Sequence, residues 1–356
     1  MLFRSLAALV IIAWISARRL LPGAVFALVT FGLAALLTTR SIHLAAASVA
    51  FAATVWVSAQ AFRRGHKAVY GTVADYVELT KPRVMSLLLL TGAAATFVGA
   101  GGVPKASVFV LTMVGLALAS GGSGASNHYL DRDIDPLMGD RTAARPVAAG
   151  RVSPESALEF GLALSALSWV LLDALVNLPT ATLALAGNLF YVFVYTRWLK
   201  RSTPQNIVIG GAAGAVPPLV GYAGTAGHLG SAAIVMFLIV FIWTPPHFWA
   251  LALMIKEHYA AANVPMLPVA KGDEETTRQI VRYSWVMLAL TLVPVAFGVF
   301  GWVYGALALL LGAIFMVYAV KLRRNPIRER AVSLFHYSML YLALLFVAMA
   351  IDAVVL

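Results

Sequence analysis

The stretch ASVFVLTMVGLALASGGSGAS, residues 106–126, runs without a charged side chain into NHYLDRDIDP, residues 127–136. The first part is apolar or small throughout and is long enough, as a helix, to cross the hydrocarbon core of a bilayer. The second part places three aspartates within five residues, directly after that apolar run. This order predicts a membrane-spanning helix that carries a polar, acidic group at the membrane boundary.

The rest of the chain repeats this apolar pattern. Of 356 residues, 61% are hydrophobic and only 12% are charged, which lies outside the composition of ordinary soluble domains. The net charge of +11 would suggest a nucleic acid in a soluble protein, but here the basic residues fall in short gaps between apolar runs. That distribution is typical of topology signals and of contact with anionic lipids. We therefore predict an all-α, polytopic protein of the lipid bilayer with no nucleic-acid partner. Because the chain has no cysteine, thiolate chemistry is excluded.

Apolar runs of spanning length predict nine helices in a core at residues 71–356. They are expected near residues 84–103, 106–126, 156–176, 180–197, 206–224, 231–254, 284–300, 302–320 and 334–356. Alternate connections are rich in Lys and Arg, and by the positive-inside rule these face the cytoplasm. Two of them, residues 127–155 and 255–283, are long and mix acids with bases, which topology signalling does not require. These two connections are therefore the candidates for chemistry.

Residues 1–70 precede this core as a separate segment. They contain three apolar runs, near residues 5–17, 22–38 and 42–62. The first could be mistaken for a signal peptide, but Arg18 and Arg19 follow it where a small-residue cleavage site is expected. We predict about three additional transmembrane helices of unknown role.

Asn127, Asp131 and Asp135 are spaced by four residues. On a helix, this spacing places them along one face with a drift of about 40° per step, so their oxygens can converge on one point. Pro136 disfavours helical geometry at Asp135, so the helix is expected to end there. Acids at a helix carboxyl end oppose the macrodipole and need a cation, and oxygen ligands of this kind suit Mg²⁺. Asp133 faces elsewhere and is expected to pair with a base.

The alternative interpretation is a solvated loop network, in which the aspartates pair with Arg132, Arg141 and Arg145. In the metal-site hypothesis, Arg141 and Arg145 contact phosphate oxygens through their planar guanidinium groups. In the alternative, they only anchor the loop at the membrane surface. The same two interpretations apply to four further candidate diphosphate-binding residues: Lys81, Arg83, Lys200 and Arg201.

Several short strings within residues 75–356 resemble the protohaem IX farnesyltransferases, a branch of the UbiA-type membrane prenyltransferases also called haem O synthases. They are LTKPR (79–83), NHYLDRDID (127–135) with RT (141–142) and RP (145–146), YTRWLKR (195–201), TPQNIVIGG (203–211), WTPPHFW (243–249) and PMLP (265–268). The strings TPQNIVIGG and WTPPHFW separate this branch from relatives in quinone pathways. Residues 1–70 lie outside the resemblance.

The resemblance implies a nine-helix bundle with a cavity in which two acidic motifs hold Mg²⁺ and farnesyl diphosphate. It implies transfer of the farnesyl group to a vinyl carbon of haem B, giving haem O. The expected location is a bacterial or archaeal cell membrane, with the active-site loops in the cytoplasm and haem-synthesis proteins as possible partners. The nearest alternative is a UbiA-type enzyme with an aromatic or quinone-precursor acceptor. A secondary transporter is the alternative from a different class.

The resemblance assigns the first metal motif to Asn127, Asp131 and Asp135. The second motif departs from the family pattern, because an aspartate is usual directly before the position of Tyr259, where this chain has His258. Either Glu257 or His258 is expected to act as the replacement ligand. His247 follows two prolines and is expected to contact haem or another acceptor, and its alternative role is that of a hydrogen-bonded structural histidine.

Overall fold

The computed structural model describes residues 71–355. In this part of the chain no strand occurs, and nine helical segments are long and apolar enough to cross a membrane. They are α5 (Pro82–Ala100), α6 (Ala106–Leu130), α8 (Pro154–Leu175), the continuous segment of α9 (Leu178–Leu189), η2 (Phe190–Leu199) and α10 (Lys200–Ser202), then α11 (Asn206–Ala226), α12 (Ser231–Met254), α14 (Leu267–Ala296), α15 (Trp302–Arg324) and α16 (Arg328–Val355). The predicted all-α core of nine spans is confirmed. The three helices predicted in residues 1–70 lie outside the described residues.

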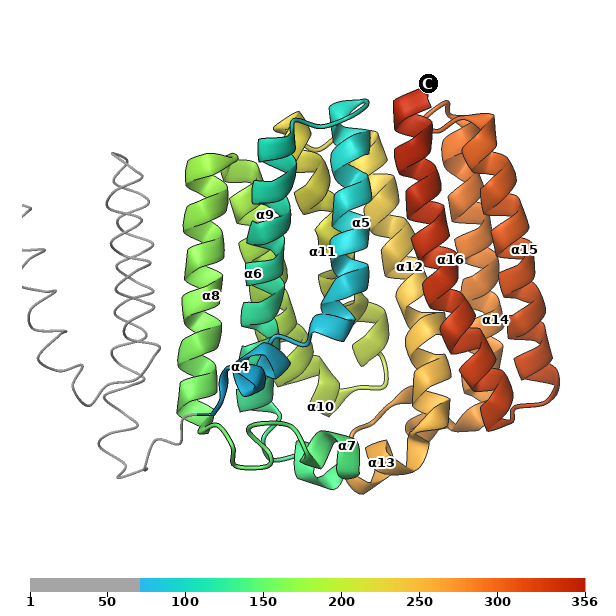
Figure 1. The fold of residues 1–356 in the computed structure, drawn as a ribbon. Coiled ribbons are helices and arrows are strands. Elements are labelled where there is room, and N and C mark those ends of the chain that lie inside the picture. The colour runs from blue at the N-terminus through green and yellow to red at the C-terminus, as the bar shows by residue number, and fades with distance from the viewer. Residues whose placement is uncertain (1–70, 356) are drawn as a thin grey trace, which may run out of the picture.

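The nine spans form a closed ring in chain order. Each span packs against the next one along the chain, and α16 returns to pack against α5. Further contacts cross the ring, chiefly those of α5 with α11 and of α12 with α16. The short helices α4 (Val73–Leu79), α7 (Asp140–Ala143) and α13 (Lys256–Ala261) lie at one end of the bundle, and the carboxyl terminus lies at the other (Figure 1). The acidic connections therefore collect at a single end.

Two glycine contacts let neighbouring spans approach closely. A Cβ added to Gly221 of α11 would lie 2.0 Å from the carbonyl oxygen of Gly92 on α5, and one added to Gly122 of α6 would lie 2.7 Å from that of Gly161 on α8. Small residues are common at membrane helix crossings, because lipid provides no hydrophobic force between helices and close van der Waals contact must replace it. These two crossings fix how α5, α6, α8 and α11 surround the acidic end.

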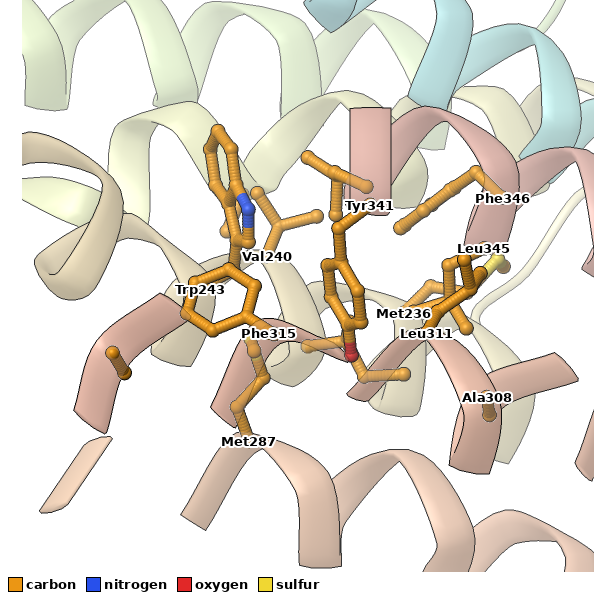
Figure 2. Packing of buried hydrophobic residues seen from close by; sticks show 14 of the residues in the cluster. Met236, Val240, Trp243, Met287, Ala308, Leu311, Phe315, Tyr341, Leu345 and Phe346 are labelled. Carbon is orange, nitrogen blue, oxygen red and sulfur yellow. The ribbon is translucent and has the colours of Figure 1, made fainter. Parts of the chain in front are cut away.

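The largest apolar core lies between α12, α14, α15 and α16. Trp243 from α12, Phe315 from α15, and Tyr341 and Phe346 from α16 are buried there (Figure 2). The Trp243 indole N–H also donates to the Ser338 carbonyl of α16 at 2.9 Å. Large aromatic side chains with such fixed partners favour one arrangement of the helices. We therefore expect α12, α14, α15 and α16 to pack as a rigid group.

Residues 255–283 differ from the prediction of one long loop. They contain α13, and α14 begins at Leu267, breaks at Gly272 and continues as helix from residue 273. Gly272 has a φ of 79°, a left-handed conformation that glycine adopts without the steric cost of a Cβ. Acidic residues 273–275 open the second part of α14, where they are favoured by the helix dipole. The predicted end of the loop at residue 283 was too late, because this helix is amphipathic before residue 284 and hydropathy does not detect it. The acidic character of residues 273–275, which favours the first turn of a helix, indicates the correct start of its second part.

Candidate active site at the acidic end of the bundle

Helix α6 ends at Leu130 and not at Asp135 as predicted. The chain then turns, and the backbone N–H of Asp135 donates to the carbonyl oxygen of Asp131 at 2.8 Å. Asp135 opens the short 3-10 helix η1 (Asp135–Leu137), in which Pro136 occupies an early position where no N–H donor is needed. A turn, and not helical periodicity, therefore brings Asp135 back towards Asp131.

The three residues of the predicted motif are buried together. Asn127, Asp131 and Asp135 have exposed fractions of 3%, 1% and 1%. The Asn127 amide donates to Asp131 Oδ2 at 2.8 Å and to Thr196 Oγ1 at 3.1 Å. Asp131 Oδ1, in contrast, is buried and accepts no hydrogen bond from the described part of the chain. Because a buried carboxylate oxygen without a hydrogen bond is unfavourable, this atom is suited to bind a cation.

Each motif residue also contacts a basic side chain from a different part of the chain. Lys200 Nζ lies 2.6 Å from Asp131 Oδ2, and Arg145 Nη1 lies 2.6 Å from Asp135 Oδ1. Lys81 Nζ donates to the side-chain oxygen of Asn127. The alternative of a solvated loop network is therefore wrong for the two buried aspartates, although the pairing of Asp135 with Arg145 does occur.

Asp133 points away from this group, as predicted. It is exposed and accepts hydrogen bonds at 2.6 and 2.7 Å from Arg201, which lower the pKa of Asp133 to about 2. Arg201 Nη2 also lies 3.8 Å from Asp131 Oδ1. Arg201 thus lies at the edge of the site, where it forms an ion pair with the exposed carboxylate of Asp133.

Burial alters the titration of two groups at the site. Burial, reinforced by repulsion from the Arg145 guanidinium, lowers the pKa of Lys81 to about 7. Burial also raises the pKa of Asp135, against the opposing effect of Arg145. Lys81 has a φ of 56°, an uncommon left-handed conformation for a residue with a side chain, and it directly precedes Pro82 at the start of α5. Such positions cluster at functional sites.

The second candidate connection, residues 255–283, packs against the first, residues 127–155. Tyr259, Val264 and Met266 pack with Ile134 and Met138 in one buried apolar cluster. Burial raises the pKa of Tyr259 to about 12, so its hydroxyl stays neutral at physiological pH. The two acidic connections that the sequence indicated therefore pack against each other, through residues that include Ile134 beside Asp135.

The expected second-motif ligands are both exposed. The His258 ring lies against Gly139, since a Cβ added to that glycine would be 3.0 Å from His258 Nε2. Glu257 forms no ion pair with another described residue. Between residues 71 and 355, no three His, Asp or Glu side chains lie close enough together to hold a metal ion. Metal binding by Glu257 or His258 stays a prediction.

The first motif nevertheless fits a magnesium ion. Mg²⁺ prefers oxygen ligands and is commonly held by one or two carboxylates, with substrate phosphate and water completing its shell. Asp131 and Asp135 offer two carboxylates and Asn127 an amide oxygen, and one of these atoms, Asp131 Oδ1, lacks any hydrogen bond within the described chain. The donor set and this unpartnered oxygen match what such an ion requires.

Sequence reasoning missed Thr196. This residue is fully buried, accepts the Asn127 hydrogen bond, and lies on η2, a π-helical segment that leads into Lys200. π-helical turns occur frequently at functional sites because they shift side chains out of the α-helical register. Thr196 does belong to the string YTRWLKR, but spacing alone directed attention to its basic residues.

Two of the predicted diphosphate-binding residues are not brought into the group. Arg83 and Arg141 are exposed, and neither forms an ion pair with another residue of the described segment. Their contact with a diphosphate stays a prediction.

His247 has the contacts of a structural histidine. Its Nδ1 and the Ser338 hydroxyl are hydrogen-bonded at 2.6 Å, and its ring stacks between Trp243 and Phe335, with centroids 4.2 and 4.7 Å away. These contacts favour the alternative interpretation given above.

His247→Ala is therefore expected to lower the free energy of unfolding by about 2 kcal/mol, because it removes a buried hydrogen bond and two ring contacts. Thermal unfolding of the purified protein in detergent measures this. The matched control is His228→Ala, since His228 is exposed and bonds only within its own turn. An unchanged unfolding temperature with weaker acceptor binding would instead support the acceptor contact.

The chain is similar to a family of known proteins. The UbiA prenyltransferase family matches residues 88–348. A protoheme IX farnesyltransferase of Roseiflexus sp. is 53% identical over 79% of this chain and 52% of its own length. One from Symbiobacterium thermophilum is 51% identical over 79% of this chain and 94% of its own length. One from Thermus thermophilus is 44% identical over 97% of this chain and 58% of its own length. The chain thus spans about half the length of the first of these relatives.

Solved structures share the fold. A digeranylgeranylglyceryl phosphate synthase has a TM-score of 0.66 at 19% identity, covering 80% of this chain and 99% of its own. A UbiA homologue from Archaeoglobus fulgidus bound to GPP and Mg²⁺ has a TM-score of 0.61 at 20% identity, covering 77% and 99%. With nine apolar spans between residues 71 and 355, a matching fold and these relatives, the chain is an integral membrane protein and belongs to the UbiA prenyltransferase family.

Proposed function

We propose that the chain transfers the farnesyl group of farnesyl diphosphate to a vinyl group of haem B, giving haem O. The observation that carries this proposal is the 51% identity to a protoheme IX farnesyltransferase of which the chain covers 94%. The geometry supports it, because buried oxygen ligands and several basic side chains stand together at one end of a membrane bundle. Mg²⁺ and a diphosphate need these two kinds of group side by side.

The reaction breaks the farnesyl C1–oxygen bond, the π bond of the vinyl group and one O–H bond of water, and it forms one carbon–carbon and one carbon–oxygen bond. The bond between the farnesyl C1 carbon and the diphosphate oxygen breaks, and the terminal vinyl carbon of haem B bonds to C1. Water then adds to the remaining vinyl carbon, which carries the positive charge, and loses a proton. The products are haem O, diphosphate and a proton, with no change of redox state.

The basic side chains of the site are proposed to stabilise the leaving diphosphate. When bound, Mg²⁺ would supply further positive charge to the same oxygens. Lys200, Arg145 and Lys81 can each donate to phosphate oxygens from their positions around the motif. Hydrogen bonds and charges of this kind act strongly where bulk water is excluded. The apolar cluster of Tyr259 and its neighbours over the aspartate loop supports such exclusion.

We further propose that the acidic end of the bundle faces the cytoplasm of a cell membrane. The connections at this end carry most of the Lys and Arg residues between spans, and the positive-inside rule associates such loops with the cytoplasmic side. Water-soluble diphosphate would then leave directly into the cytoplasm.

Membranes that contain the protein are expected to convert haem B to haem O when farnesyl diphosphate and Mg²⁺ are added. Extraction of the haems and mass analysis measure the product. Membranes without the protein are the control, and chelation with EDTA should stop the reaction until Mg²⁺ is restored. Prenylation of an aromatic acid without any haem O would show that the acceptor is wrong while the prenyltransferase assignment holds.

A further inference from the structure

Three oxygens that a metal ion could use at this site, on Asn127, Asp131 and Asp135, each lie next to a base that a diphosphate would use. Lys200 holds Asp131 at 2.6 Å, Arg145 holds Asp135 at 2.6 Å, and Lys81 donates to Asn127. The proposed metal ligands and the proposed diphosphate-binding bases are thus bonded to each other in this structure. Neither ligand can take its full set of contacts without separating one of these pairs.

The pair of Lys200 and Asp131 is the most enclosed of the three. The side chains of Lys200 and Asp131 are 9% and 1% exposed. Removing one partner of a buried ion pair is strongly unfavourable, because the other charge is left without compensation. A divalent cation on Asp131 alone would leave the Lys200 ammonium buried beside a like charge. A diphosphate on Lys200 alone would leave the Asp131 carboxylate buried beside an anion.

Joint binding removes both difficulties. The cation then compensates the carboxylates, the bases compensate the diphosphate, and no buried charge is left unpaired. Asp131 Oδ1 has no hydrogen bond and can accept the first contact with a cation while Lys200 still holds Oδ2.

We infer that metal and diphosphate bind this protein as a strongly coupled pair, with Lys200 as the residue that exchanges Asp131 for the diphosphate. This inference rests on the proposed function, since it takes the site to be that of a metal-dependent prenyltransferase. Arg201 does not have the same role, because its partner Asp133 is exposed and can be left to water. The coupling disfavours the metal-only state, in which the acids would be occupied without substrate.

The coupling predicts that Lys200→Met binds a divalent cation more tightly than the unsubstituted chain does when no diphosphate is present. The probe is Mn²⁺ alone, whose free concentration is read by electron paramagnetic resonance with the full chain in detergent. The variant leaves Asp131 unpaired, so we expect its Mn²⁺ affinity to rise about tenfold, within the usual range of coupling between sites. Binding of labelled inorganic pyrophosphate in EDTA should weaken in the same variant.

Lys105→Met is the matched control, because Lys105 is an exposed lysine in the connection before α6, at the opposite end of that helix from the aspartates. It should change neither affinity. Lys200→Gln, which keeps a polar contact to Asp131, serves if the methionine variant does not fold, and it should show the same direction of change.

The unsubstituted chain gives an independent test. Its Mn²⁺ affinity, corrected for the complex of Mn²⁺ with pyrophosphate in solution, should rise about tenfold on addition of pyrophosphate. Equal Mn²⁺ affinities with and without pyrophosphate, or in the unsubstituted and Lys200 variants, would overturn the inference. Coupling without any haem O would instead reject only the proposed acceptor, so the two failures are distinguishable.

Discussion

Asp131→Asn is expected to slow farnesyl transfer by about 10²- to 10³-fold in a protein that still folds. Asp131 is buried, and its Oδ2 accepts hydrogen bonds from Lys200 and Asn127, which an asparagine oxygen at the same place can also accept. The substitution therefore keeps these hydrogen bonds but removes the negative charge that compensates Lys200 and that would hold a divalent cation. Loss of one preorganised electrostatic group of this kind lowers kcat by about 10²- to 10³-fold. The rate of haem O formation measures the effect, and gel filtration confirms folding.

Asp133→Asn is the matched control, because it is the same substitution two residues away. Asp133 is exposed and pairs with Arg201, and exposed ion pairs contribute only about 0–1 kcal/mol. Its rate should stay within a few-fold of the unsubstituted protein. Retention of near-normal transfer by Asp131→Asn would mean that this aspartate does not hold the metal, and the site assignment would have to be abandoned.

The contrast between these aspartates was partly predictable from sequence. Helical spacing correctly separated Asp133 from Asn127 and Asp131. Asp135 was correctly grouped with Asp131, but the helical geometry predicted for it was wrong, because α6 ends at Leu130 and a hydrogen-bonded turn follows. Spacing by four residues is shared by a helix and by this turn, so the pattern alone could not distinguish them.

Hydropathy is sufficient to predict the bounds of some spans but not of others. Helix α12 occupies Ser231–Met254, the predicted range, because glycine and polar residues bound its apolar run sharply. Helix α14 extends well before the predicted start at residue 284, because its first turns are polar overall and bury only one face, which includes Thr276, Thr277 and Ile280. Hydropathy averaged over a window detects burial in lipid but not an amphipathic helix that continues beyond the bilayer.

The basic residues show the limit of prediction for the site. Lys200 and Arg201 are neighbours in sequence and were predicted to have the same role. In the structure they hold different carboxylates, Lys200 the buried Asp131 and Arg201 the exposed Asp133. This difference depends on the direction in which each side chain leaves the end of η2, and the π-helical register of that segment has no signal in composition or spacing.

Gly221→Ala is expected to destabilise the bundle strongly, although alanine is the better helix former. An alanine in place of glycine within a helix normally stabilises it by about 1 kcal/mol. At Gly221, however, the new Cβ would lie 2.0 Å from the carbonyl oxygen of Gly92, a backbone atom that cannot rotate away. Helices α5 and α11 must separate, and overpacking of this kind costs about 1–3 kcal/mol or more. Thermal unfolding in detergent and the yield of monodisperse protein measure the loss.

Gly214→Ala, two turns earlier on the same helix, is the matched control. No atom lies within 4 Å of a Cβ added at Gly214, so the unfolding temperature should stay the same or rise. The comparison also tests how the fold supports the site, because α5 begins directly after Lys81, which contacts Asn127. If α5 moves away from α11, Lys81 should move with it, and the surviving Gly221→Ala protein should bind pyrophosphate more weakly than Gly214→Ala. Equal stability of the two variants would mean that α5 and α11 do not cross at these glycines, and the position of Lys81 would then need another explanation.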